Sequence, residues 1–446
     1  MTQTERTRAT PGRRRLAQLA AGALALALLN ATFLAVLVLV QQLNGAPMEQ
    51  SLRRSAERGQ ISLDPWPQVQ VGLRTFTLDQ YTDCLAYSTA IDGPEPSPLR
   101  RAVQARILSE TAANPCEHLI RHLTERAPWT ADPYFRYWHG YQTYLRPLLR
   151  NWDVATIHRV NYAMAGACFA AFAAAVFTSL PWMAAAALLA LLLALTDALV
   201  VPLVAAHFAG MVVTLLTCTA ALLALRRPPD DNWRRLRWIA LVSGAVFNFV
   251  DFLINPPFAP TLMAFLALST WTWRGGGPGQ SAREQLREAS LVVATWFAAY
   301  AATWAAKWAI AAAILGPNQV LGDILFAAHR RAAGDVAGAP VSFGAAAVEN
   351  FAMIGWTSVV AVVIATAVGL ALLLARYGDT RKRLARFGVL CLPALIPLLW
   401  LETLRSHSVE HVLFAYRSAA LSLVLPLVAV TLLWSKARKE QSRESQ

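Results

Sequence analysis

The run RRRLAQLAAGALALALLNATFLAVLVLV, residues 13–40, decides the class of this chain. Its apolar part, Leu16 to Val40, is long enough to cross a hydrocarbon core of roughly 30 Å as a helix. The run is longer than the apolar region of a signal peptide, and no small-residue cleavage site precedes the polar residues after it, so we expect a retained helix. Similar apolar runs recur along the chain, which indicates a protein that crosses the membrane several times.

The composition agrees with a lipid environment. The chain has 446 residues, of which 56% are hydrophobic and 15% charged, whereas soluble domains carry roughly a quarter charged residues. The formal net charge of +13 comes mostly from Arg and Lys in short segments between apolar runs. Cytoplasmic loops of membrane proteins have this distribution. It argues against nucleic acid as a partner and favours membrane lipids.

The apolar runs predict an all-α polytopic bundle of about ten transmembrane helices. Basic segments at both ends place both termini in the cytoplasm, which agrees with an even helix count and with a bacterial cytoplasmic (inner) membrane. We expect the helices at about 16–40, 157–179, 182–200, 202–225, 238–254, 258–273, 289–315, 351–375, 387–404 and 412–434.

This topology divides the chain into five regions. They are a basic cytoplasmic N-terminus (1–15), the first helix (16–40), an extracytoplasmic loop (41–155), the remaining bundle (156–434) with a second external loop (316–349), and a basic cytoplasmic tail (435–446). Within the first loop, apolar residues at helical spacing in 99–126 and the aromatic, basic stretch 134–152 predict amphipathic helices in the membrane interface. The glycine-rich stretch 275–279 lacks the Lys-Ser/Thr of a phosphate-binding loop and predicts a linker.

Two of the five cysteines, Cys84 and Cys116, fall in the first external loop. In an oxidising compartment they would pair as a disulfide, but two free thiols explain the sequence equally well. The other three lie inside apolar runs, where cysteine packs as a small apolar residue.

Ionisable residues concentrate near the outer ends of the predicted helices. A charge in the hydrocarbon costs on the order of 3 kcal/mol even on lenient scales, so retained charges are functional candidates. We interpret them as lining a polar cavity open to the outer face; the alternative is that they reach out to the headgroups. The set comprises Asp197, His207, Asp251, Lys307, Glu402, His407, His411 and Arg417.

Two motifs in the first external loop carry candidate chemistry. Asp79 and Asp83 are four residues apart, which places both carboxylates on one helix face if the segment is helical; one carboxylate would serve as a general base. In Arg136-Tyr137-Trp138-His139, the arginine can hold a phosphate and the rings can stack on a sugar or a lipid headgroup. The alternatives are two solvated acids and an interfacial aromatic belt.

A third motif, His407-Ser408-Val409-Glu410-His411, fits the H-x-x-E-H string of one class of zinc peptidases. Here the string occupies a very short outer turn, and no third ligand is clearly placed. Together with Arg417, the two imidazoles suit phosphate binding at the membrane surface better than zinc. We therefore predict no metal site and no cofactor, and a divalent metal has no support in these residues.

Taken together, these motifs resemble uncharacterised bacterial polytopic membrane proteins of envelope-polysaccharide loci. The resemblance rests on the Asp-x-x-x-Asp pair after the first helix, the stretch RYWHGYQTYLRPLL (136–149), and the late HSVEHVLFAYR (407–417). More distantly, the plan is similar to that of the GT-C glycosyltransferases. Those enzymes have many transmembrane helices and a large first external loop with an essential acid and interfacial helices, and their donor is a sugar on polyprenyl phosphate.

The resemblance implies a division of roles among these residues. Asp79 or Asp83 would be the catalytic base, while cationic and aromatic side chains bind the donor. This predicted substrate-binding set comprises Arg136, Trp138, His139, Lys307, His407, His411 and Arg417. The chain lacks the adjacent acidic pair that many GT-C enzymes carry in this loop, which leaves the choice of base open.

The expected function is transfer of a sugar from a polyprenyl-phosphate donor to an envelope glycan, lipid or protein on the extracytoplasmic face. Envelope-biosynthesis proteins would then be partners. One alternative is a transporter or flippase of a lipid-linked or anionic substrate, which predicts midplane polar sites and broken helices. Another is a non-catalytic envelope-assembly protein whose external loop docks other proteins.

Overall fold

The structure of the chain, a computed structural model, describes residues 11–71, 74–91, 97–108, 114–127, 131–227, 231–274, 281–336 and 338–445. The predicted linker 275–279 and residues 1–10 of the basic N-terminus lie outside this range. The described residues are mostly helical. Their strands form three short antiparallel pairs: β1 (Gln68–Val71) with β2 (Arg74–Thr77), β3 (Ile107–Leu108) with β4 (Ala131–Asp132), and β5 (Asp335–Val336) with β6 (Ala339–Pro340).

Seven described helices are long and apolar enough to cross a membrane, so the chain is a multi-pass membrane protein. They are α1 (Pro11–Gln41), α7 (Val154–Phe177), α9 (Ala205–Leu225), α12 (Ala282–Leu315), α15 (Trp356–Tyr377), α16 (Thr380–Cys391) continuing through a 3₁₀ turn into α17 (Leu395–Thr403), and α19 (Val412–Glu444).

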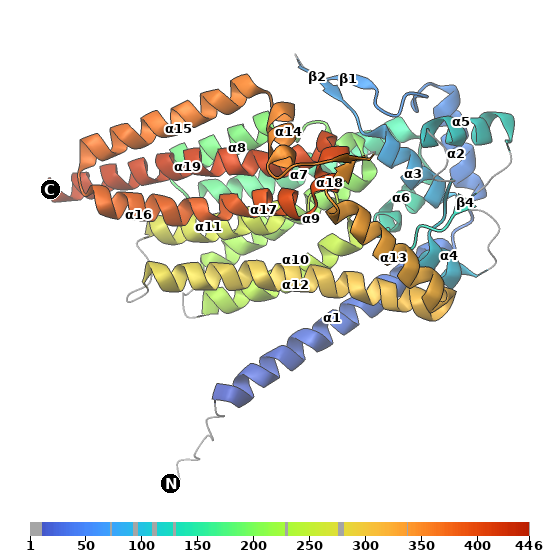
Figure 1. Cartoon of the computed structure of the whole chain (residues 1–446), viewed down its shortest axis with the longest axis horizontal. Coiled ribbons are helices and arrows are strands. Elements are labelled where there is room, and N and C mark those ends of the chain that lie inside the picture. Colours follow the sequence, from blue (N-terminus) through green and yellow to red (C-terminus); the bar gives the residue numbers. More distant parts are fainter. Residues whose placement is uncertain are drawn as a thin grey trace, which may run out of the picture.

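Three further helices pack in the same bundle: α8 (Trp182–Leu195), α10 (Asn232–Val250) and α11 (Phe258–Arg274). Helices therefore occupy all ten predicted positions, although α8 and α11 are short and α10 begins with three arginines. The count of ten membrane crossings stays a prediction. The N-terminal end of α1 and the C-terminal end of α19 both lie on the side of the bundle away from the first loop (Figure 1).

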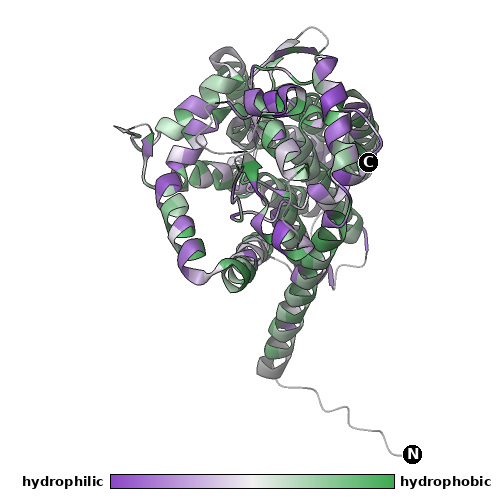
Figure 2. Cartoon of the chain, turned by 90° about the vertical axis from the view of Figure 1, so that its right-hand side faces the viewer, coloured by the Kyte–Doolittle hydropathy of each residue, from purple (hydrophilic) through white to green (hydrophobic). Residues whose placement is uncertain are grey.

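The predicted first external loop folds as a module on one end of the bundle (Figure 1). It contains α2 (Ala46–Glu57), α3 (Gln80–Ala90), α4 (Pro98–Gln104), α5 (Pro115–Glu125) and α6 (Gln142–Leu149). Figure 2 views this end and shows the mixture of polar and apolar residues on its helices, in contrast to the apolar length of α1. Cys84 and Cys116 form a disulfide between α3 and α5, which decides between the two interpretations of these thiols.

The aromatic stretch at 134–141 is not the interfacial helix that its composition predicts. It is irregular, and only α6 in the following residues is helical. Apart from the half-buried Tyr134, its rings are buried inside the protein. Trp138 donates from Nε1 to the Thr303 carbonyl of α12 at 2.9 Å, and the Gly140 N–H donates to the Phe249 carbonyl of α10 at 2.7 Å. The prediction is wrong here because the bundle, and not lipid, covers these side chains.

The predicted helical stretch 99–126 is also divided. α4 ends at Ala105, whose backbone is left-handed (φ 46°), and α5 begins only after its N-cap Asn114. The second external loop contains α13 (Pro317–Ala332) and the start of α14 (Ala345–Ile354), and α18 (Arg405–Glu410) forms the last outer turn.

Two buried cations hold the module on the bundle. Arg146 of α6 donates to the Val40 and Leu43 carbonyls at the end of α1, at 3.0 and 2.9 Å, and to the Ala90 carbonyl at the end of α3. Lys307 of α12 donates to the Val103 carbonyl near the end of α4 at 2.7 Å. Carbonyl groups at helix C-termini carry partial negative charge, which stabilises cations there.

The contact between α10 and α12 depends on a glycine. A Cβ atom at Gly244 would overlap the Trp296 carbonyl of α12 and lie 3.3 Å from the Ala299 Cβ. Small residues allow membrane helices to approach this closely. We expect Gly244→Ala to destabilise the protein by about 1–3 kcal/mol, measured as a lower Tm in detergent.

Gly166 of α7 is the matched control, because a Cβ atom there meets no atom within 4 Å. Gly166→Ala should leave the Tm unchanged or raise it, since alanine favours the helix over glycine. An equal Tm for both variants would contradict the close packing of α10 on α12.

Candidate functional site

Two helix interruptions face one another where the bundle meets the module. The first lies between α8 and α9 and contains a 3₁₀ turn, Val201–Leu203. The second lies between α10 and α11, where the Asp251 carboxylate accepts hydrogen bonds from the Leu253 and Ile254 N–H groups at 2.8 and 3.0 Å. Aspartate commonly terminates a helix in this way. Irregular backbone is tolerated at such a depth only where protein or a cavity satisfies its polar groups.

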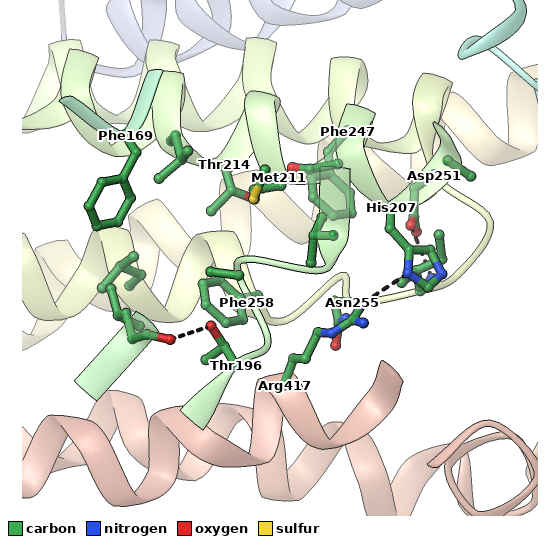
Figure 3. Close-up of a pocket in the computed structure, with 18 residues that line it drawn as sticks. Phe169, Thr196, His207, Met211, Thr214, Phe247, Asp251, Asn255, Phe258 and Arg417 are labelled. Carbon is green, nitrogen blue, oxygen red and sulfur yellow. Dashed lines mark hydrogen bonds between the residues drawn. The ribbon is translucent and has the colours of Figure 1, made fainter. Parts of the chain in front are cut away.

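A pocket with about 740 Å³ of empty space, part of it open to the outside, lies between these interruptions and α19. Figure 3 shows its two kinds of lining. The polar end carries His207, Asp251, Asn255 and Arg417. The rest is an apolar slot, with side chains that include Phe169, Leu192, Met211, Leu215, Phe258 and Leu262. The pocket therefore fits an amphipathic ligand.

Three side chains form a buried chain from the module to this pocket. Arg417 Nη1 lies 2.8 Å from His207 Nδ1, as Figure 3 shows, and His207 Nε2 lies 3.0 Å from Asp79 Oδ2. A guanidinium only donates, so Nδ1 is the acceptor and the imidazole proton sits on Nε2, facing Asp79. Asp79 thus contacts the imidazole on the side away from the pocket. Catalytic sites in which an acid orients a histidine that acts as a base have the same arrangement.

Asp79 is the N-cap of α3, one position before the helix begins, and Asp83 lies in the first turn of the same helix. The Asp79 carboxylate accepts from the Thr82 N–H at 3.0 Å and the Thr82 hydroxyl at 2.7 Å. Burial would raise the pKa of Asp79, but hydrogen bonds from His207 and Thr82 outweigh burial and lower it. Asp79 therefore stays ionised, with its oxygens already occupied.

Asp83 also reaches the start of α9, but it has a different partner there. Its carboxylate accepts from the Ala205 N–H at 2.8 Å, at the start of α9, and lies 3.4 Å from the Tyr87 hydroxyl. Burial raises the pKa of Asp83 well above its usual value, despite the hydrogen bond from Ala205. Asp83 thus joins α3 to α9 and lies outside the lining of the pocket.

Four residues of the predicted substrate-binding set have partners elsewhere. Arg136 pairs with Asp323 of α13 at 3.0 Å. Lys307 and Trp138 hold the module on α12, as described above. His139 is contacted on both ring nitrogens, by the Tyr141 hydroxyl at 3.0 Å and the Tyr134 carbonyl at 2.8 Å, and burial lowers its pKa to about 3. None of the four lines the pocket.

His407 and His411 lie beside the pocket. Their rings are 4.6 Å apart, and His411 stacks on Phe414, which in turn contacts His207. Burial lowers the pKa of both imidazoles, so they are neutral rather than cationic. His407 Nε2 lies 2.9 Å from the Leu253 carbonyl. Of the predicted binding set, only Arg417 lines the pocket itself.

Within the described residues, no group of three or more His, Cys, Asp or Glu side chains is placed to hold a metal ion. The H-x-x-E-H string at 407–411 therefore has no third ligand of these types in that part of the chain.

Three residues of the polar end were not among the predicted site residues. His207 and Asp251 belong to the outer ionisable set. Their position near the ends of predicted membrane helices, where ionisable side chains are costly, is the sequence feature that indicated them. Asn255 precedes Pro256-Pro257; its amide donates to the Phe414 carbonyl at 2.9 Å, and its oxygen accepts from the Ser418 hydroxyl at 2.7 Å.

No known protein family, curated protein or solved structure matches this chain.

The opposite pKa shifts of the two acids predict different pH dependences for their Asn variants. Asp83 has a raised folded pKa, so wild-type stability declines as the pH rises above 3.8, the ordinary value, towards the folded pKa. The stability of Asp83→Asn relative to wild type should therefore grow with pH, by up to about 1.4 kcal/mol per pH unit. Tm measurements between about pH 5 and 8 would show this trend.

Asp79→Asn is the matched comparison. The Asp79 pKa lies below 3.8 when folded, so its stabilising effect is present above that pH and is lost only as the pH falls further. Asp79→Asn should lower the Tm by a constant amount over the same range. Parallel pH profiles for the two variants would contradict the opposite directions of the two pKa shifts.

Proposed function

We propose that this protein is an integral-membrane glycosyltransferase of a bacterial cytoplasmic membrane. It transfers a sugar from a polyprenyl-phosphate donor to an envelope glycan, lipid or protein on the extracytoplasmic face. The proposal rests on the pocket, which has Arg417 and His207 at one end and an apolar slot at the other. That lining suits a ligand with an anionic head and a hydrocarbon tail.

The side of the membrane is part of this proposal. The module carries the Cys84–Cys116 disulfide, and disulfides persist in oxidising compartments such as the bacterial periplasm. The polar end of the pocket faces the module through Asp79, so the sugar and its acceptor would meet on that side.

The geometry supports a specific division of labour. Arg417 donates to the donor phosphate, which frees His207 Nδ1 from its contact with Arg417. His207 then takes the proton of the acceptor hydroxyl, and the acceptor oxygen forms a bond to the anomeric carbon. The bond from that carbon to the phosphate oxygen breaks, and the lipid phosphate leaves with the electron pair, stabilised by Arg417. Asp79 is a positioning residue that stabilises the imidazolium.

Binding of the donor head is tested with undecaprenyl phosphate and the uncharged polyprenol as probes. Because hydrogen bonds to charged groups contribute about 1.5–3 kcal/mol, Arg417→Gln should weaken binding of the phosphate about ten- to a hundredfold. Polyprenol binding should not change. Arg330→Gln is the control, since Arg330 is 64% exposed and pairs with Glu410 outside the pocket. Equal losses for both probes would reject a phosphate site at Arg417.

The chemical role of His207 is tested separately. His207→Gln should keep undecaprenyl phosphate binding and lower sugar transfer by about 10²- to 10⁴-fold, the usual contribution of a general base. Cells carrying the variant should show altered envelope glycans by mass spectrometry, whereas His329→Gln, an exposed histidine of α13, should match wild type. Unchanged glycans in His207→Gln cells would remove this assignment.

One observation favours a second candidate, a flippase of a lipid-linked substrate. The helix interruptions at 196–204 and 251–257 meet at the pocket, and broken helices often form transporter binding sites. Proteoliposomes with a polyprenyl-phosphate sugar on one leaflet distinguish the two candidates: a flippase moves the lipid across without an acceptor, whereas a transferase forms product only when an acceptor is added.

A further inference from the structure

A second, larger cavity lies at the opposite end of the bundle from the module. It has about 1330 Å³ of empty space, part of it open to the outside, and is bounded by α1, α9 and α10. Arg227, Arg234 and Arg235 line it together with Trp238 and small residues of α1. The proposed glycosyltransferase function makes no use of this cavity.

The cavity exists because α1 leaves the bundle. α1 stacks Phe33 on Phe249 of α10 at 4.2 Å. Nearer the N-terminal end of α1, Gly22 still approaches Leu241 closely, since a Cβ atom at Gly22 would lie 3.3 Å from Leu241 Cδ1. Beyond this point α1 diverges from the other helices (Figure 1). Ala17 and Ala21 therefore face a wedge between two membrane helices, and in a bilayer hydrocarbon chains fill such a space.

The charged side chains in the described lining of this wedge are all arginines. Arg234 pairs with Asp231 at 3.0 Å, with both side chains about half exposed, and Arg235 donates to the Asn232 side chain at 3.0 Å. Asp231 is not part of the lining, and the part of the lining that the structure describes holds three arginines and no acid. Trp238 follows one turn later and is 39% exposed; tryptophan at this position marks the level of the headgroups.

We propose that this cavity binds an anionic phospholipid in the leaflet opposite the module. The phosphate would lie among Arg227, Arg234 and Arg235, and an acyl chain would lie along Ala17, Ala21 and Leu223. Basic pockets between transmembrane helices recognise anionic lipid headgroups in this way. A zwitterionic lipid lacks the net charge that three guanidinium groups select.

The test uses the full chain, purified in detergent, with native mass spectrometry after addition of phosphatidylglycerol or phosphatidylcholine. Wild type should retain phosphatidylglycerol in preference to phosphatidylcholine. The triple variant Arg227→Gln, Arg234→Gln, Arg235→Gln should bind phosphatidylglycerol about tenfold more weakly or worse, since each basic residue near the surface contributes to attraction. Millimolar inorganic phosphate should not compete; competition would assign the site to a soluble anion and overturn the proposal.

A matched control removes the same charge elsewhere. Arg376, Arg381 and Lys382 lie at the junction of α15 and α16, exposed and outside the cavity. Their triple Gln variant should bind phosphatidylglycerol as wild type does, and an equal loss in both variants would show non-specific attraction only.

A second variant keeps every charge. Ala21→Trp fills the wedge and should also weaken phosphatidylglycerol binding, whereas Ala23→Trp, exposed and outside the lining, should not. Unchanged binding in Ala21→Trp would place the lipid elsewhere on the protein.

Discussion

Arg417 carries a permanent positive charge into the interior of the protein, and the polar end of the pocket is organised around that charge. The residue is 7% exposed, and a buried charge without a partner is severely destabilising. The Asp79 carboxylate balances the positive charge of Arg417, but it does so through the neutral ring of His207 and not by direct contact. Because Asp79 belongs to the module and Arg417 to α19, this pairing also fixes how the module sits on the bundle.

Burial of a charge does not by itself identify a functional site in this protein. Arg146 and Lys307 are as deeply buried as Arg417, yet their donors are directed at carbonyl groups near the ends of α1, α3 and α4. These partners belong to the backbone and cannot be exchanged for a ligand. The partner of Arg417 is another side chain at the wall of a pocket, and a phosphate can replace it.

The sequence predicted those features that depend on local composition. Length and apolarity of a run are properties of consecutive residues, so the membrane-spanning helices and the separate polar module were recognisable. The contact of the Asp79, His207 and Arg417 side chains was not recognisable, because these residues are far apart in sequence. His207 and Arg417, for example, are separated by 210 positions. Only the concentration of ionisable residues at helix ends indicated that some of them would meet.

The stretch around Trp138 shows a different limit. Aromatic rings beside arginines are typical both of a membrane interface and of a joint between two parts of a protein. Composition cannot separate these cases, since both place one edge of each ring in an apolar environment and leave a polar atom to be satisfied. The Thr303 carbonyl, which accepts from Trp138, belongs to α12, and that partner is a matter of tertiary structure.

The polar end of the pocket finally shows which of its groups remains available to a ligand. Asp251 is occupied by two backbone N–H groups and the Tyr300 hydroxyl, and Asn255 by Phe414 and Ser418. These two side chains satisfy interrupted backbone and shape the wall. Arg417 differs, because its Nε is buried without a hydrogen-bond partner among the described residues. An unsatisfied buried donor is costly, and an anionic head entering from the apolar slot would relieve that cost.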